Sequence, residues 1–386
     1  MIEVLLLDGE NRSTLAACRS LGRRGLNVAV VGPANCITHT SKFCTQIIVQ
    51  SSDKEAYISE LKTLLRELRP SLFLPMTDHT MELISNDESI YSRSPLPNLQ
   101  SLQTVQKKEK LLELCQDLSI SIPKSQYVQS AADISNWSTF PAVLKTARAA
   151  DVKRISKQKV EYFLTRKDLE NHINTHQANS PWLLQEQIVG PGVGVFVLAE
   201  EGKVHATFCH RRILEKPPSG GVSVLSESIA LKDAPVREAV KLVQSLGWTG
   251  VAMIEFKYCA EKRIPFLMEI NPRFWGSLQL SISCGVDFPW LLYLMNKMEL
   301  GSKEGLKALE RARDYKVGNR LRWDLGTLDH LIIRLKNEGF PAVKNILRNN
   351  ELHLSLSSRT IHETITGDDP EPFWQELKNY CGSIFT

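Results

Sequence analysis

The chain has 386 residues, an apolar content of 42% and a formal net charge of +4 at pH 7. Domains of roughly 100 to 200 residues are typical, so two or three are expected here. The small net charge disfavours nucleic-acid binding, which needs a concentrated basic face, and no apolar run approaches the roughly 18 residues of a membrane span. Because Glu3 and Asp8 also argue against a signal peptide, the sequence predicts a soluble cytoplasmic protein without a nucleic-acid or membrane partner.

Eight cysteines are spread along the chain without C-x-x-C spacing, and most lie within apolar segments. Such cysteines are typical of buried free thiols rather than of a disulfide framework or a zinc site. They are Cys18, Cys36, Cys44, Cys115, Cys209, Cys259, Cys284 and Cys381.

Alternating apolar strands and amphipathic helices are predicted over the first hundred residues. Residues 2–8 and 27–31 are predicted strands that flank a helix at 13–24, and a helix at 55–68 precedes a strand at 71–75. This order is typical of a doubly wound parallel sheet, so the fold class is α/β. The turn after the first strand lacks G-x-G-x-x-G, and no dinucleotide is expected on it. Asp78 and His79 follow the last strand, at an edge where ligands often bind, although a capped loop explains them equally well.

The middle of the chain contains two short strands separated by a basic segment. A helix is predicted at 107–118, and strands at 141–145 and 182–189, the first ending in Lys145 and the second at Gly190. Residues 145–159 between them are rich in Lys and Arg, which favours a flexible cationic loop. The predicted domains are a leading one at 1–103, a central one at 104–190 and a C-terminal one at 191–386.

The third region alternates strands with loops from 193 to 270 and includes a helix at 235–246. The segment H-R-R-I-L-E-K-P-P-S-G-G at 210–221 combines a basic cluster with a Pro-rich turn and paired glycines. Such a loop could offer guanidinium groups to an anionic substrate, with Arg212 preferred over Arg211, although a solvated surface hairpin is the alternative. No element is assigned to the tail after residue 300.

Two glutamates are predicted to meet across a hairpin. The strand-like runs at 251–259 and 265–270 are joined by a short polar connection, which favours an antiparallel hairpin. If the register is symmetric about Lys262, Glu255 lies opposite Glu269, and the two carboxylates stand roughly 5 Å apart on one face. Like charges so placed destabilise a sheet unless a cation binds, a proton is shared or the register differs.

Asn271 favours a cation among these remedies. It follows Glu269 by two residues, so in a strand it lies on the same face and adds a neutral oxygen ligand. Mg²⁺ prefers such hard oxygen ligands and commonly takes a few carboxylates together with substrate phosphates. Arg273 and the following F-W-G-S turn are typical of a nearby anion site. The alternative is an ordinary hairpin with both glutamates in solvent.

The residues Glu269-Ile-Asn271-Pro-Arg273 followed by Gly276-Ser277, with Glu255 in the preceding strand, resemble the last metal-binding strand of the ATP-grasp superfamily. The resemblance covers roughly residues 1–300 and is greatest to carboxylate-amine ligases related to carbamoyl phosphate synthase and biotin carboxylase. It implies an ATP-grasp fold, with α/β and α+β lobes, and a Rossmann-like leading domain.

The resemblance also implies roles for individual residues. Metal ligation would fall to Glu255, Glu269 and Asn271, which would hold Mg²⁺, or Mn²⁺ in its place, against the ATP phosphates. Phosphate contacts would come from Lys110 and Lys145, and adenine contacts from the hinge residues Gln185, Glu186 and Ile188. Arg273 would stabilise an acyl phosphate.

The implied activity is an ATP-dependent ligase that phosphorylates a carboxylate and couples it to an amine, releasing ADP and phosphate. Two features depart from the family pattern: Gly190 and Gly192 replace a ribose-binding Glu past the hinge, and the phosphate-covering loop at 146–159 has no glycine. Because the loop lacks glycines, a non-catalytic ATP-binding protein is an alternative. A small-molecule or carboxylate kinase and a bicarbonate-phosphorylating enzyme of the carboxylase kind are further alternatives. Relatives are often dimers, which makes a homodimer a further expectation.

Overall fold

The computed structural model of the chain describes residues 1–50, 54–146, 160–176, 182–259, 261–341, 344, 346 and 359–385. These residues form two compact units. Unit 1 comprises Met1–Pro97, Val193–Met253 and Asn271–Thr386, and unit 2 comprises Asn98–Gly192 and Ile254–Ile270. The three-part division into residues 1–103, 104–190 and 191–386 stays a prediction, whereas the structure groups the leading segment with most of the C-terminal one.

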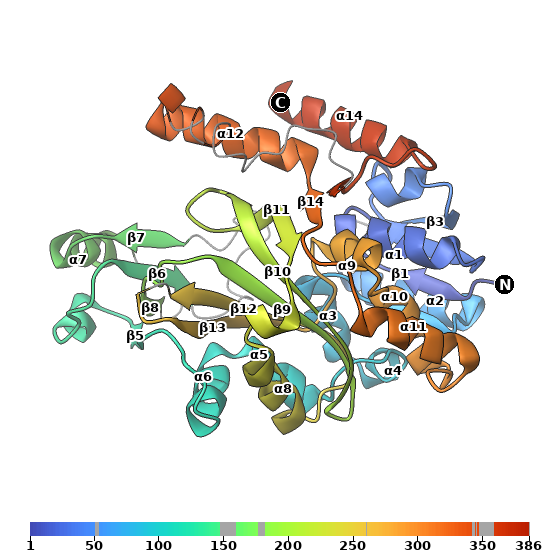
Figure 1. Cartoon of the computed structure of the whole chain (residues 1–386), viewed down its shortest axis with the longest axis horizontal. Helices are drawn as coiled ribbons and strands as arrows, with labels where there is room; N and C mark the ends of the chain where they lie inside the picture. The colour runs from blue at the N-terminus through green and yellow to red at the C-terminus, as the bar shows by residue number, and fades with distance from the viewer. Residues whose placement is uncertain are drawn as a thin grey trace. The chain divides into compact units, whose positions relative to one another are not determined.

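Unit 1 begins with a parallel sheet in the strand order β3-β2-β1-β4. Figure 1 labels β1 and β3 of this sheet. Its strands are β1 (Val4–Leu6), β2 (Val28–Gly32), β3 (Cys44–Val49) and β4 (Leu72–Leu74), and its helices are α1 (Arg12–Gly22), η1 (Ile37–Thr40), α2 (Lys54–Leu68), α3 (Asp78–Ser85) and α4 (Glu88–Tyr91). Strands β1, β2 and β4 are buried along their whole length, as expected of parallel strands covered on both faces. The predicted doubly wound start of the chain is confirmed.

A second sheet of unit 1 places β9 (Gly192–Glu200), β10 (Lys203–Lys216), β11 (Val222–Ser228), β14 (Arg320–Arg322) and β15 (Thr360–His362) side by side in that order. The first pairs are antiparallel, and β14 and β15 are parallel. β12 (Gly250–Cys259) extends this sheet beside β9 and continues into unit 2. The helices are η4 (Leu231–Asp233), α8 (Val236–Ser245), α9 (Leu278–Cys284), α10 (Phe288–Asn296), α11 (Lys303–Arg313), α12 (Asp324–Glu338) and α14 (Glu371–Phe385).

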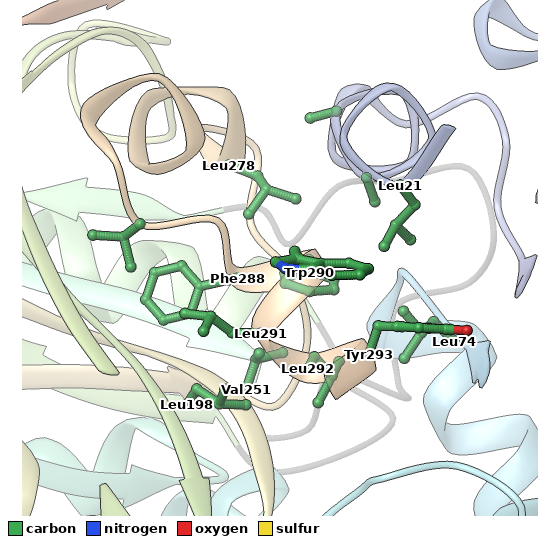
Figure 2. Close-up of a cluster of buried hydrophobic side chains, with 14 of the residues drawn as sticks. Leu21, Leu74, Leu198, Val251, Leu278, Phe288, Trp290, Leu291, Leu292 and Tyr293 are labelled. Carbon is green, nitrogen blue, oxygen red and sulfur yellow. The ribbon is translucent and has the colours of Figure 1, made fainter. Parts of the chain in front are cut away.

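Helix α10 lies at the centre of the core of unit 1. Its start is fixed by Asp287, whose side chain accepts the backbone N–H of Trp290 (3.3 Å). Figure 2 shows its apolar side chains reaching toward α1 and β4 on one side and toward β9 and β12 on the other. Each such side chain stabilises the fold by about 1.5–3 kcal/mol when fully buried. The helix therefore packs the two sheets of unit 1 into one core.

The C-terminal tail is joined to α1 by a buried ion pair. Arg19 Nε donates to Asp369 Oδ2 (2.8 Å), and these side chains are only 0% and 2% exposed. Asp369 also accepts Ser41 Oγ–H (2.7 Å) and the backbone N–H of Lys42 (2.9 Å). Arg23, the exposed residue at the C-terminal cap of α1, pairs with Asp368. Residues 350 positions apart thus form one network.

Unit 2 contains a four-stranded antiparallel sheet in the order β5-β8-β6-β7. Its strands are β5 (Ser125–Val128), β6 (Ala142–Thr146), β7 (Glu161–Phe163) and β8 (Trp182–Glu186), and its helices are α5 (Leu99–Gln106), α6 (Lys108–Asp117), η2 (Ala131–Ile134) and α7 (Arg166–Thr175). The end of β12 and β13 (Ile264–Asn271) complete the unit as a hairpin. The predicted hairpin is confirmed.

Two predictions about the chain as a whole can be compared with the structure. All eight cysteines are free, and six of them are buried, as their apolar surroundings predict. No single helix in the described ranges combines the length and apolarity of a membrane span, and α9 and α10, bent at 86°, meet that criterion only as a pair.

Candidate active site

Lys145 is surrounded by charged side chains of unit 2. It lies near the end of β6, where its backbone pairs with Leu183 of β8. The pKa of Lys145 is lowered to about 7, mainly by burial and further by the positive charge of Lys108, while the carboxylates of Glu269 and Glu255 oppose the shift. One lysine therefore lies within electrostatic range of both glutamates that the sequence singles out.

Lys108, the first residue of α6, is the second lysine of this group. Burial lowers its pKa, and the Glu269 carboxylate opposes that shift. Lys110, which the resemblance assigns to phosphate, is exposed two residues later on the same helix. Positions two apart on a helix face different sides, so the structure brings Lys108 rather than Lys110 close to Lys145. The phosphate role of Lys110 stays a prediction, and Lys108 was missed because its sequence neighbours are also lysines.

The two glutamates lie on adjacent strands of the hairpin. Glu255 on β12 is only 8% exposed, whereas Glu269 on β13 is exposed. The turn between them is closed by the backbone N–H of Arg263, which donates to the carbonyl of Cys259 (2.8 Å). Both carboxylates lie near enough to Lys145 for their charges to oppose the lowering of its pKa. Their direct opposition about Lys262 stays a prediction.

The hinge after β8 is held tightly by its side chains. Gln185 is buried and its Nε2 donates to Ser125 Oγ (2.7 Å). Glu186 accepts the backbone N–H of Lys124 (3.0 Å) and lies 3.6 Å from Lys262 Nζ. Both side chains therefore fix the end of the strand, which leaves backbone groups as the means by which this segment could contact a ligand.

Ile188 and Gly190 continue the hinge. Ile188 is buried against Phe266 of the hairpin, and no backbone hydrogen bond joins it to another residue in the described part of the chain. Gly190 has φ +154, and a Cβ there would lie 1.9 Å from the carbonyl oxygen of Tyr258. Only glycine permits this approach. The close contact with Tyr258 therefore explains why a glycine occupies position 190.

Arg273 follows β13 and binds residues of unit 1. Its Nη2 donates to Asp78 Oδ2 (2.6 Å) and to Asn271 Oδ1 (3.2 Å), and its Nη1 to the Phe274 carbonyl (3.0 Å). Asp78 is the first residue of α3 and directly follows Thr77, whose side chain caps that helix. The carboxyl end of β4 thus supplies the partner of Arg273, as the position of Asp78 after a strand suggests.

Asp8 fixes the edge of the sheet that carries Asp78. It lies just past β1, is buried, and accepts Thr80 Oγ1–H (2.5 Å) and the backbone N–H of Met76 (2.9 Å). Burial raises the pKa of this carboxyl, and the hydrogen bonds from Thr80 and Met76 oppose that shift. The chain segments that follow β1 and β4 are therefore tied together at their carboxyl ends.

The basic cluster on β10 is largely ion-paired. Arg212 Nη1 donates to Glu215 Oε1 (2.9 Å) and to the Gly221 carbonyl (3.2 Å), which closes the Pro-rich turn. Arg211 Nε donates to Glu227 (2.8 Å), to which Arg320 also donates (3.0 Å). Although burial alone would raise it, these two guanidiniums lower the pKa of Glu227. The substrate role of Arg212 stays a prediction.

His210 and Ser277 form a buried contact that the sequence did not single out. His210 Nδ1 lies 3.2 Å from Ser277 Oγ, in the turn that follows Arg273. The pKa of His210 is lowered to about 3, mainly by burial and also by the charge of Arg212, so the imidazole is neutral at physiological pH. His210 begins the basic segment at 210–221, but nothing in the sequence links it to Ser277, 67 residues later.

The flexible cationic loop predicted at 145–159 stays a prediction, since residues 147–159 lie outside the described residues. Within the described ranges, no group of three His, Cys, Asp or Glu side chains is arranged to hold a metal ion. This criterion does not count asparagine, so it does not test the proposed ligands Glu255, Glu269 and Asn271.

Three solved structures illustrate the fold that this chain shares. An L-amino acid ligase from Bacillus licheniformis has a TM-score of 0.62 and 18% identity, covering 78% of this chain and 76% of that chain. Biotin carboxylase from Campylobacter jejuni, solved with β,γ-ATP, has a TM-score of 0.63 and 14% identity, covering 83% and 74%. The biotin carboxylase domain of the 2-oxoglutarate carboxylase from Hydrogenobacter thermophilus was solved with MgADP and bicarbonate. It has a TM-score of 0.58 and 13% identity, covering 77% of this chain and 70% of that chain.

The chain therefore has the ATP-grasp fold, and the family resemblance read from residues 255–277 is confirmed. More particularly, residues 178–318 match the family described as ATP-grasp in the biosynthetic pathway with Ter operon. A comparison with curated proteins finds no match.

Proposed function

We propose that the protein is an ATP-dependent ligase that activates a carboxylate by phosphorylation and joins it to an amine. The ATP-grasp fold and its likeness to an L-amino acid ligase support this class of activity. The observation that carries the proposal is the gathering of Lys145, Lys108, Glu255 and Glu269 within unit 2.

These four side chains combine the two kinds of charge that a magnesium nucleotide requires. Ammonium groups neutralise phosphate oxygens as compact point charges, and carboxylates bind the accompanying divalent ion. The pKa of Lys145, lowered to about 7 mainly by burial, would rise when a polyanion binds beside it. The neutral side chain would then regain its proton and charge.

The donor set of the hairpin suits Mg²⁺. Glu255, Glu269 and Asn271 would hold the ion with hard oxygen atoms, and phosphate oxygens would complete its coordination. When bound, the ion would neutralise negative charge on the transferred phosphoryl group. In the metal-free protein, Arg273 donates to the Asn271 oxygen, so Asn271 would exchange this contact for the ion.

The chain's own residues would position the reactants. Ile188 and its neighbours, whose side chains pack inward, would present backbone groups to adenine. Arg273, held by Asp78, would stabilise the acyl phosphate. Positioning and charge neutralisation suffice for in-line phosphoryl transfer, and no protein nucleophile is needed.

The proposed reaction has two steps. A carboxylate oxygen of the substrate attacks the γ-phosphorus of ATP, so that a new P–O bond forms as the bond to the β–γ bridging oxygen breaks and ADP leaves. The amine then attacks the acyl carbon, forming a C–N bond and releasing phosphate and a proton.

The test is an ADP-release screen of carboxylic acids against amino acids with Mg²⁺. Glu269→Gln is expected to abolish turnover and leave the fold intact, since removing one of two neighbouring negative charges relieves repulsion in the metal-free protein. Glu261→Gln, at an exposed position in the turn of the same hairpin, is the matched control and should keep full activity. Unchanged turnover in Glu269→Gln would refute the metal site.

A bicarbonate-phosphorylating enzyme is the second candidate, because the fold is as similar to biotin carboxylase as to the ligase. The same screen, run with and without added bicarbonate, separates the two. ADP release that needs bicarbonate and no other acid would favour the second candidate, whereas release that needs both an acid and an amine favours the ligase.

A further inference from the structure

The guanidinium of Arg12 is held from two sides within unit 1. Its Nε donates to Glu363 Oε2 (2.7 Å), and its central carbon lies 3.6 Å from the centroid of the Trp323 ring. Its two Nη atoms have no hydrogen-bond partner among the described residues, and the side chain is 16% exposed. Arg12 is thus held in place, and its two Nη groups can donate hydrogen bonds to a ligand.

Arg12 lies at the same edge of the first sheet as the partner of Arg273. It is the first residue of α1, which follows β1, and Asp78 follows the neighbouring parallel strand β4. Gly276 is exposed in the turn after Arg273, and a Cβ there would meet only Arg12 Nη2, at 3.4 Å. Ligands favour such carboxyl edges of parallel sheets, so the free donors of Arg12 lie beside the turn that follows Arg273.

The positive charge of Arg12 is only partly neutralised. Burial raises the pKa of Glu363 to about 7, although the Arg12 guanidinium opposes the shift, so a fraction of its carboxyl groups is protonated near neutral pH. The negative charges of Glu376 and Asp324 act on Glu363 and help to raise its pKa, and Asp324 itself pairs with Arg322. Arg12 therefore keeps charge for an incoming anion.

We propose that Arg12 is a specificity-determining residue that binds a non-reacting oxyanion of a substrate, so that the amine joined by the ligase carries a carboxylate or a phosphate. This inference rests on the proposed function. With Nε occupied, the two Nη donors form a planar edge that matches two oxygens of an anion. Glu363 and Trp323 are positioning residues, because they act only through Arg12.

The test measures binding rather than turnover. The full chain with MgADP is titrated with the twenty common L-amino acids, their carboxamides, phosphoethanolamine and inorganic phosphate, using calorimetry and thermal shift. At least one oxyanion is expected to bind wild type, and its carboxamide counterpart should bind at least tenfold more weakly. Binding of an amino acid assigns a carboxylate, whereas binding of a phosphate compound assigns a phosphate.

Variants locate the anion. Arg12→Met should weaken binding at least tenfold with ADP affinity unchanged, and Arg12→Lys should weaken it less, because a single charge remains. Gly276→Val keeps Arg12 and its partners but places side-chain atoms against Nη2, one of the two donors, so it should weaken oxyanion binding in the same direction as Arg12→Met. It also serves as the check if Arg12→Met fails to fold.

Two results would overturn the inference: wild-type affinity in both Arg12→Met and Gly276→Val, or no oxyanion of the panel binding to wild type. Failure of wild type to bind MgADP would instead contradict the proposed function, and the two failures are therefore distinguishable.

Discussion

At the scale of single residues, Lys145 carries the main electrostatic consequence of the site. A lysine whose pKa is lowered to about 7, mainly by burial, holds fewer protons in the folded protein than in the unfolded chain between about pH 7 and its ordinary value of 10.5. Its burial therefore costs stability at neutral pH, and this cost diminishes as pH rises through that range. Such a cost is expected where a charge is kept for a ligand.

Nucleotide binding should accordingly take up protons. At pH 8 most Lys145 side chains are neutral, and the phosphates of ATP restore the ammonium form. Titration calorimetry in two buffers of different ionisation enthalpy should give uptake of a substantial fraction of one proton for wild type and much less for Lys145→Met. Equal uptake by both proteins would assign the proton to another group.

Lys108 and Lys110 offer a direct comparison on one helix. Lys108→Met is expected to weaken ATP binding by about tenfold or more, an energy of about 1.4 kcal/mol, because it removes a charge close to Lys145 and Glu269. Lys110→Met, at an exposed position, should change the dissociation constant by less than twofold. The opposite ranking would restore the role that sequence resemblance assigns to Lys110.

Sequence patterns predicted a group of neighbouring charges better than they predicted individual contacts. Glu255, Glu269 and Lys145 were proposed as site residues because their types and order match a family pattern, and in the structure their charges interact. Lys108 was not found because three lysines in four positions cannot be ranked without knowing where the helix begins. Arg12 and Glu363 were not found either, since residues 351 positions apart carry no joint signal.

At the scale of elements, the hinge packs closely on the hairpin within unit 2. The Tyr258 N–H donates to the Pro191 carbonyl (3.1 Å), and the Tyr258 carbonyl lies against Gly190. Strands and helices with a clear hydrophobic period were predicted within a few residues of their bounds, among them β1, α1 and α8. The tail was not assigned because its short strands and helices depend on distant partners.

Gly190→Ala tests this contact. The new Cβ would lie 1.9 Å from the Tyr258 oxygen, and φ +154 is unfavourable for alanine, so the free energy of unfolding should fall by about 2 kcal/mol or more. Urea denaturation checks the stability, and ADP binding should weaken in parallel. Gly301→Ala is the control, since nothing lies within 4 Å of a Cβ there; comparable losses in the two variants would contradict the steric reason.

At the scale of the whole molecule, unit 1 is built from three separate segments of the chain. Arg19 of the first segment and Asp369 of the last are buried together at 2.8 Å. The desolvation cost of a buried ion pair offsets much of its contribution to stability, but removing one partner leaves an uncompensated buried charge. Hydropathy could not predict this pair, because Arg19 reads as an ordinary polar residue on an amphipathic helix.

Arg19→Met is therefore expected to lower the free energy of unfolding by about 3–5 kcal/mol. Arg23→Met, at the C-terminal cap of α1, removes the ion pair with Asp368. Because the side chains of Arg23 and Asp368 are 36% and 47% exposed, this change should lower the free energy of unfolding by less than about 1 kcal/mol. Denaturant titration of both variants gives the comparison. Similar losses of unfolding free energy in the two variants would mean that burial does not determine how much each ion pair matters for stability.

The distance along the chain between Arg19 and Asp369 has a consequence for biosynthesis. Residues 1–97 leave the ribosome long before the tail does, and until then the Arg19 guanidinium lacks all of its partners in Glu363, Thr364 and Asp369. Unit 1 is therefore completed only when the tail has been made, and stop codons placed before residue 363 should yield chains whose residues 1–97 are digested by proteases faster than in the full chain.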